Sequence, residues 1–319
     1  MDKELWLKQK RLNNIQSLLL IIALIIILGI LGNIIAGKIM AVSAILFVVL
    51  LYFLNPVISP QLVLKRYRTR QIAPYQAPNL YAALEFLAKR ANLETIPKLV
   101  YLPSDKINAF AVGSPNNAVI ALSDAILRRL SLKELIAVIA HEVSHIAHED
   151  TRIMGFADLM SRLTNFLSII GQFLLIFKLL LLLFNIFLIS WATILILIFA
   201  PIVTDLLQLA LSRTREYNAD LGAVALLGDP KTLASALLKI DAYQGNLLGH
   251  IFLPGQRSAE PSLFRTHPPT KQRVKRLLAL RYSDERVWQN LPLGIDIPLS
   301  FFISRSPLPS RWHFDGIKF

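Results

Sequence analysis

Long uncharged stretches near the N-terminus constrain this chain more than any other feature of its 319 residues. No charged side chain occurs between Arg11 and Lys38, and a second uncharged stretch runs from Ile39 to Leu64. Each is long enough to cross a bilayer as a helix, which takes about 20 residues. Because only 17% of the residues are charged and 54% are hydrophobic, part of the surface must face lipid. The sequence therefore predicts a transmembrane hairpin at the start of the chain.

A third apolar region spans residues 163–204, with Lys178 as its only charged residue. It is long enough for two more crossings, although a hairpin that only covers the site from above also fits. Basic residues cluster before the first span and again from Lys65 onward. The positive-inside rule therefore predicts a multi-pass protein of the cytoplasmic membrane, with its N-terminus and the globular segments after Lys65 in the cytoplasm.

The net charge of +13 has two interpretations, lipid anchoring and nucleic-acid binding. The chain has no recognisable nucleic-acid motif and no basic stripe interleaved with aromatic residues. We therefore expect the lipid bilayer, and not nucleic acid, as the partner of these charges.

The segments between the apolar regions have the patterns of a globular domain. Ser131 and Glu134 form a capping-box pattern, which predicts a helix running to His148, and Asp229-Pro230 opens another helix. Helical spacing covers Tyr81–Asn92, and short apolar runs predict strands at Lys98–Leu102, Ile107–Val112 and Ala118–Leu122. The expected fold class is mainly α with a small β-sheet and about four transmembrane helices.

These patterns divide the chain into segments. They are a transmembrane hairpin (1–64), the first half of a catalytic domain (65–162), a second transmembrane hairpin (163–204), the second half of that domain (205–290) and a tail (291–319).

The sequence His141-Glu142-Val143-Ser144-His145 lies inside the predicted apolar helix. Residues four apart share one helical face, so both imidazoles point at one spot, as two nitrogen ligands of a tetrahedral zinc do. Glu142 is placed to take a proton from a water on the metal. Two solvated histidines on a surface helix are the alternative, which the apolar surroundings disfavour.

A catalytic zinc needs a third protein ligand, and the chain contains no cysteine to supply it. His148 is one option, although its spacing from His145 does not match the three-histidine pattern. Glu216 is the better option, with Asp220 one turn later to orient a ligand histidine. Glu216 and Asp220 could equally form an ordinary salt-bridge face with Arg213 and Arg215.

Four motifs in this order resemble the HtpX-type membrane zinc metallopeptidases, which are themselves similar to the CaaX prenyl proteases. They are Asn108-Ala-Phe-Ala-Val-Gly113, His141-Glu-Val-Ser-His145, Ser212-Arg-Thr-Arg-Glu216-Tyr-Asn-Ala-Asp220 and Thr266-His-Pro-Pro269. The resemblance covers residues 1–280, and Tyr217 departs from it because phenylalanine is common there. It implies a gluzincin-like catalytic domain, with one zinc held by His141, His145 and Glu216 and with Asp220 beside them.

The resemblance also implies an endopeptidase that degrades misfolded or membrane proteins. Asn108, Ala109 and Phe110 would then lie along the substrate cleft, although a plain buried strand is the alternative. His267 would act as a catalytic donor to the developing oxyanion, although a lone histidine is more often structural.

Two rival functions remain at this point. A prenyl-protein protease would use the same chemistry but should need more membrane spans to enclose a lipidated substrate. A zinc-stabilised scaffold would need no base, and the presence of Glu142 argues against it.

Overall fold

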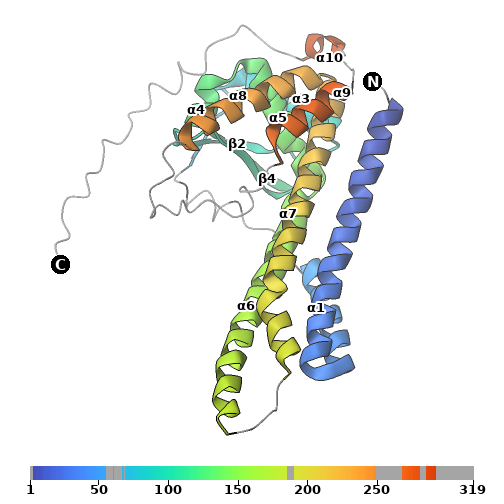
Figure 1. Cartoon of the computed structure of the whole chain (residues 1–319). Coiled ribbons are helices and arrows are strands. Elements are labelled where there is room, and N and C mark those ends of the chain that lie inside the picture. Colours follow the sequence, from blue (N-terminus) through green and yellow to red (C-terminus); the bar gives the residue numbers. More distant parts are fainter. Residues whose placement is uncertain are drawn as a thin grey trace, which may run out of the picture.

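The computed structural model describes residues 3–54, 60, 67, 69–184, 190–248, 268–280 and 285–291. Figure 1 shows a bundle of long helices that carries a globular part at one end. The helices and strands are, in chain order, α1 (Lys3–Leu54), β1 (Arg70–Gln71), α3 (Pro78–Arg90), β2 (Lys98–Leu102), β3 (Ala109–Ser114), β4 (Asn117–Ser123), α4 (Asp124–Arg129), α5 (Leu132–Ala147), α6 (Asp150–Leu182), α7 (Trp191–Leu227), α8 (Pro230–Leu248), α9 (Thr270–Ala279) and α10 (Glu285–Gln289).

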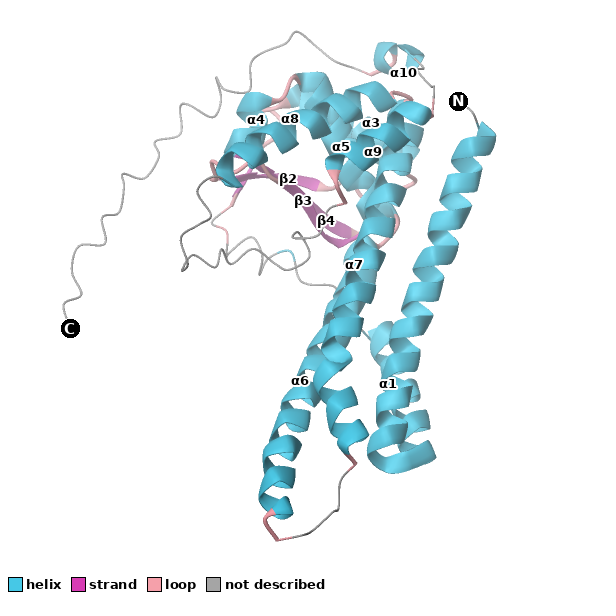
Figure 2. Ribbon diagram, viewed as in Figure 1, coloured by secondary structure: helices cyan, strands magenta, loops and turns pink. Residues whose placement is uncertain are grey.

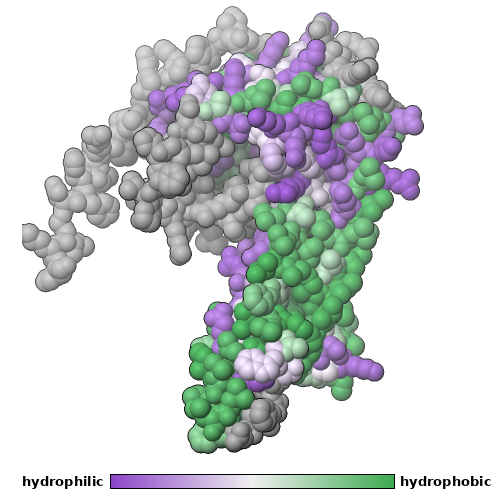
Figure 3. Space-filling view, in the orientation of Figure 1, coloured by the Kyte–Doolittle hydropathy of each residue, from purple (hydrophilic) through white to green (hydrophobic). Residues whose placement is uncertain are grey.

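In the described part of the chain, the helices long and apolar enough to cross a membrane are α1, α6 and α7. The helix α1 is a hairpin of two arms, because Ala36 and Gly37 have non-helical backbone angles and Gly37 has a φ of 77°. Figure 3 shows hydrophobic residues covering the surface of this bundle, whereas hydrophilic residues gather over the globular part. The predicted fold class is therefore confirmed, with three candidate membrane helices, of which α1 bends into two arms.

Both helices of the second hairpin extend well past the predicted segment 163–204. The helix α6 begins at Asp150, shortly after the end of α5, and α7 continues from the apolar region to Leu227. Because each helix is unbroken, the membrane part and the globular part share the same rigid elements. The segment boundaries given above stay predictions.

The sheet has the strand order β1-β2-β4-β3, so β3 is its last strand within the described chain. The strands β2 and β4 are parallel, and β3 and β4 are antiparallel, with Ala109 opposite Leu122. Figure 2 shows the sheet lying beneath the helices of the globular part. Its inner face and these helices form the main core, which includes α5 and the C-terminal end of α7. The three predicted strands are present, with β3 and β4 shifted by one or two residues.

The capping box at the start of α5 is present as predicted. The Ser131 hydroxyl accepts a hydrogen bond from the Glu134 amide, and the Glu134 carboxylate accepts one from the Ser131 amide at 2.9 Å. The helix then runs through twelve buried residues, so its orientation is fixed by the core. Asp229 likewise caps α8, since its Oδ1 accepts hydrogen bonds from the amides of Lys231 and Thr232.

Candidate metal centre

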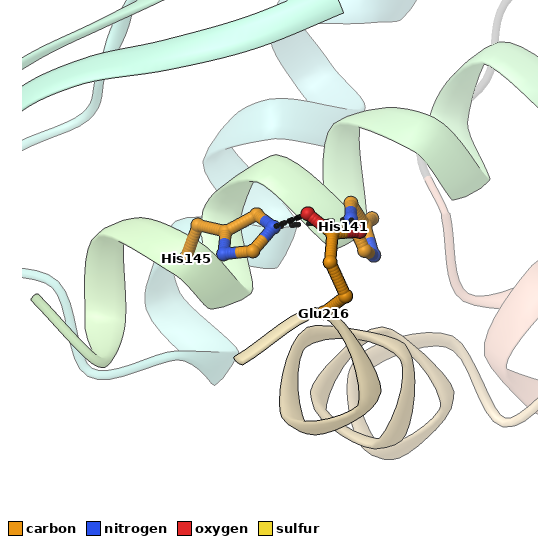
Figure 4. A group of neighbouring side chains, drawn as sticks. All are labelled: His141, His145 and Glu216. Atoms are coloured by element: carbon orange, nitrogen blue, oxygen red, sulfur yellow. Dashed lines mark hydrogen bonds and ion pairs between the residues drawn. The ribbon is translucent and has the colours of Figure 1, made fainter. Parts of the chain in front are cut away.

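Both histidines of the His-Glu-x-x-His pattern lie on one face of α5, as their spacing predicts. Their Nε2 atoms are 3.1 Å apart, and the rings meet at 90°. His141 is buried and His145 is half-buried, so neither imidazole is a solvated surface group. Figure 4 shows both rings directed toward Glu216.

The helix α7 brings Glu216 to the two imidazoles from the other side. Its carboxylate oxygens lie 3.5 Å from Nε2 of His141 and 3.6 Å from Nε2 of His145. Ligands bound at about 2.0–2.1 Å to a tetrahedral zinc are about 3.3 Å from one another. The two contacts involve different oxygens of Glu216, and one ligand atom from each of the three side chains lies within 4.8 Å of the others, close enough to share a metal ion.

Asp220 lies one turn after Glu216 on α7. Its Oδ1 atom is 3.1 Å from Nδ1 of His141, the nitrogen that faces away from Glu216. Burial alone would lower the pKa of His141, but the nearby carboxylates of Asp220 and Glu216 outweigh it and raise this pKa to about 10. Without a metal these carboxylates favour the protonated imidazole, and the position of Asp220 beside Nδ1 leaves Nε2, on the side of Glu216, as the atom that would bind a metal.

Asp150 orients the second histidine, and the sequence analysis did not identify it. Its Oδ2 atom lies 2.7 Å from Nδ1 of His145, and Arg215 of α7 pairs with its Oδ1 atom. Glu149 makes this contact possible, because its left-handed backbone, with a φ of 52°, joins α5 to α6 in a sharp turn. An acidic residue directly after the end of the helix was the signal that could have revealed it.

Arg273 of α9 is the second residue that the sequence analysis missed. Its guanidinium lies 3.0 Å from Glu216 and donates to both oxygens of Asp220 at 2.8 and 2.6 Å. Burial alone would lower the pKa of Arg273, but the charges of Asp220 and Glu216 have the larger effect and raise it above its usual value. The guanidinium therefore stays cationic. No local pattern points to Arg273, because it meets α7 only in the folded chain.

The buried charges around the imidazoles also fit a divalent cation. These residues are at most 8% exposed and comprise the carboxylates of Glu142, Asp150, Glu216 and Asp220 and the guanidiniums of Arg215 and Arg273. The carboxylates outnumber the guanidiniums by two, and an uncompensated buried charge is costly. A dication that displaces the extra proton of His141 cancels this excess, so both the donor set and the charge suit zinc.

The alternative third ligand, His148, lies elsewhere. Its Nδ1 atom is 2.8 Å from the carbonyl of Ser144, one turn back on the same helix, and burial lowers its pKa. Within the described residues, the group of His, Asp and Glu side chains able to share one metal ion consists of His141, His145 and Glu216. Geometry therefore favours Glu216 over His148.

The predicted cleft residues begin the edge strand β3. The backbone of Asn108 faces β4, since its carbonyl accepts from the Ser123 amide at 3.0 Å. In an antiparallel pair this direction alternates, so the backbone groups of Ala109 and Ala111 point away from β4, where a peptide can add to the sheet. The side chain of Phe110 is buried in the sheet core, and by the same alternation its backbone groups face β4, so Phe110 supports the strand and its neighbours Ala109 and Ala111 face a substrate. His267 lies outside the described residues.

Comparisons with known proteins show which family the sequence resembles. The sequence profile of peptidase family M48 matches residues 74–281. A protease HtpX homolog of Desulfatibacillum aliphaticivorans is 34% identical over 280 residues, which cover 84% of this chain and 90% of the relative. A protease HtpX homolog of Thermococcus kodakarensis is 36% identical over 257 residues, covering 77% and 88%. Among solved structures, S. mikatae Ste24p is similar with a TM-score of 0.42 and 21% identity, covering 86% of this chain and 66% of that one.

Proposed function

Because the chain belongs to peptidase family M48, we propose that it is a zinc-dependent membrane endopeptidase whose metal is held by His141, His145 and Glu216. Membership of this family makes the chain a membrane metalloprotease. The observation that supports the zinc site is the meeting of three side chains: the two Nε2 atoms are 3.1 Å apart, and the two oxygens of Glu216 lie 3.5 and 3.6 Å from them.

Zinc, when bound, polarises the scissile carbonyl and makes a water easier to deprotonate. Glu142 is buried on α5 beside His141, and we assign it as the base that takes the proton of the attacking water. The same carboxyl group then returns the proton to the leaving amine. Asp220 and Asp150 keep the two imidazoles in the tautomer that presents Nε2.

The substrate in this proposal is a polypeptide, bound in extended form along β3. Ala109 and Ala111 offer backbone groups on the open side of that strand, and Asn108 precedes them as a further hydrogen-bonding group. Because this recognition uses the backbone, it suits unfolded chains of varied sequence. Misfolded proteins and membrane proteins at the cytoplasmic face are therefore the proposed substrates, and His267 is proposed as the donor to the oxyanion.

The arrangement of α6 and α7 supports a site on one side of the bilayer. The helix α6 leaves the globular part and α7 returns to it, so His145 and Glu216 meet although an apolar hairpin separates them in sequence (Figure 1). Two crossings between the ligands satisfy the requirement that one metal is reached from one side.

The decisive experiment pairs bound metal with cleavage. Wild type, Glu142→Gln and the control Glu85→Gln, which alters an exposed residue of α3, are purified in detergent and supplied with zinc. We expect one zinc per chain in all three, with casein hydrolysis reduced by about 10²–10⁴-fold only in Glu142→Gln. Undiminished cleavage by Glu142→Gln would exclude this base, and failure of the wild type to bind zinc would exclude the metal site.

A further inference from the structure

The N-terminal turns of α1 lie against the globular part instead of projecting from the membrane. Leu5 and Trp6 pack on the core that contains α5, and the Trp6 indole donates to the carbonyl of Leu221 at 3.0 Å. The Nδ2 atom of Asn218 donates to Oδ1 of Asn14 at 3.0 Å, two residues after Glu216 on α7. The helix that enters the bilayer is thus a wall of the domain that holds the metal ligands.

The same part of α1 also contacts α9. The Nη2 atom of Arg276 donates to Oδ1 of the buried Asn13 at 3.3 Å. The Arg276 guanidinium stacks 3.9 Å from the centre of the Tyr217 ring, and the Tyr217 hydroxyl donates to Gln272 at 3.1 Å. Arg276 therefore joins α9 to both α1 and α7.

Arg273 lies one turn before Arg276 on the same helix. It holds Asp220 at 2.6 Å and Glu216 at 3.0 Å, so a small rotation of α9 would draw it away from both carboxylates. Because a short helix turns as a unit, the contact at Arg276 fixes where Arg273 can reach.

From these contacts we propose that Asn13 and Arg276 are positioning residues for the metal centre. By holding α9, they keep Arg273 on Glu216 and Asp220 and so keep these carboxylates in place for the metal. The proposal rests on the proposed function, since it concerns the same site, and it makes the first transmembrane segment part of the metal-binding machinery.

Some buried polar groups of α1 and α7 lack hydrogen-bond partners among the described residues. The interface between the two helices is therefore sensitive to the loss of one hydrogen bond. Within the part of the chain that the structure describes, the buried polar atoms without a hydrogen-bond partner include Gln9 Oε1, Asn13 Nδ2 and Ser17 Oγ of α1 and Asn218 Oδ1 of α7. Each unpartnered group costs about 1–3 kcal/mol, so the interface depends on the few bonds that it does make. Replacing Asn13 by leucine removes one such unpartnered group along with the acceptor for Arg276.

Substitutions at Asn13 can therefore test whether this residue positions the metal centre or only stabilises the fold. The variants are Asn13→Leu, Arg276→Met and Asn13→Asp, with Gln9→Met as a control on the same helix. Zinc affinity is measured by competition with a chromophoric chelator, alongside thermal unfolding and casein hydrolysis. Loss of a direct partner of a metal ligand costs about 10–100-fold in affinity, and we expect about three- to tenfold for these indirect positions.

We expect Asn13→Leu and Arg276→Met to weaken zinc binding and slow hydrolysis while Asn13→Leu unfolds at the wild-type temperature or above. Asn13→Asp keeps the acceptor and should bind zinc as wild type does, and so should Gln9→Met. In a background of Arg273→Met, Asn13→Leu should cause no further loss of affinity.

Wild-type zinc affinity in Asn13→Leu, or fully additive losses with Arg273→Met, would overturn the proposal. If Asn13→Leu does not fold, an Asn13→Asp variant with weakened zinc binding would overturn it equally. Should the wild type bind zinc and cleave nothing, the proposed function fails while the zinc measurements still decide this inference.

Discussion

The Nδ1 atom of His145 lies 2.7 Å from Oδ2 of Asp150, across the sharp turn where α5 ends and α6 begins. The first residue of a membrane-crossing helix thereby orients one of the two imidazoles. Arg215 of α7 pairs with the same carboxylate, so both helices of the second hairpin meet behind this histidine.

Asp150→Asn should weaken zinc binding by about 10–100-fold, since the amide keeps the shape but loses the charge that fixes the His145 tautomer. Competition with a chromophoric chelator measures this change. Asp158→Asn, on the same helix and paired with the exposed Arg162, is the control and should bind zinc as wild type does. Equal affinity in the two variants would show that Asp150 does not act on the metal.

Glu216→Gln should weaken zinc binding by more than about 100-fold, the upper limit for loss of a mere partner of a ligand. The matched variant is His148→Gln, because His148 bonds to the Ser144 carbonyl and not to the three ligands. Zinc content after dialysis distinguishes them. If His148→Gln lost the metal and Glu216→Gln kept it, the assignment of the third ligand would be reversed.

Gly222→Ala should disturb the site by separating α7 from α5. A Cβ at Gly222 would lie 1.9 Å from Oγ and 2.8 Å from Cβ of Ser144, so the two helices could not stay as close. Overpacking of this kind costs about 1–3 kcal/mol, and Glu216 would move with its helix. We expect lower thermal stability and weaker zinc binding, with partial recovery of zinc binding in the double variant Ser144→Gly, Gly222→Ala.

Glu134 should make the globular part sensitive to acid. Burial raises the pKa of Glu134, but hydrogen bonds from Lys239, Ser131 and Ser235 outweigh it and lower this pKa from 4.5 to about 2. The folded state therefore binds this proton more weakly than the unfolded state. The resulting stability is fully present above pH 4.5 and is lost as the pH falls toward about 2.

Thermal unfolding between pH 3 and 7, compared for wild type and Glu134→Gln, measures this contribution. The variant should be less stable at neutral pH, by about 1–3 kcal/mol for the unpaired buried groups, and should lose less stability on acidification. Parallel curves for the two proteins would contradict the assignment.

The parts of the site that follow a helical repeat were predictable from the sequence. His141 and His145 are one turn apart, as are Glu216 and Asp220, so each pair had to share a face. The fold class was also predictable, because the length of each apolar stretch is a local property of the sequence. The pairing of the two helices rested on the family resemblance, because spacing alone could not bring Glu216 to His141.

Asp150, Arg273 and the packing of Trp6 could not be predicted in this way. Arg273 reaches Glu216 through the placement of α9, and Trp6 reaches Leu221 across 215 residues of chain. Both depend on how rigid helices pack in three dimensions, which no short repeat encodes. The contact between His145 and Asp150 is closer in sequence, but it requires the left-handed backbone of Glu149, a conformation uncommon outside glycine.

The continuity of α7 has a mechanical consequence. From Trp191 to Glu216 the helix is about 37 Å long at a rise of about 1.5 Å per residue, and its lower part stands in lipid. A change of about 1° in its tilt would therefore move Glu216 by about 0.6 Å. Tilt is how a spanning helix adapts to bilayer thickness, so the carboxylate and the imidazoles on α5 would come into register at one thickness in preference to others. The distance between Glu216 and the two imidazoles would then depend on bilayer thickness.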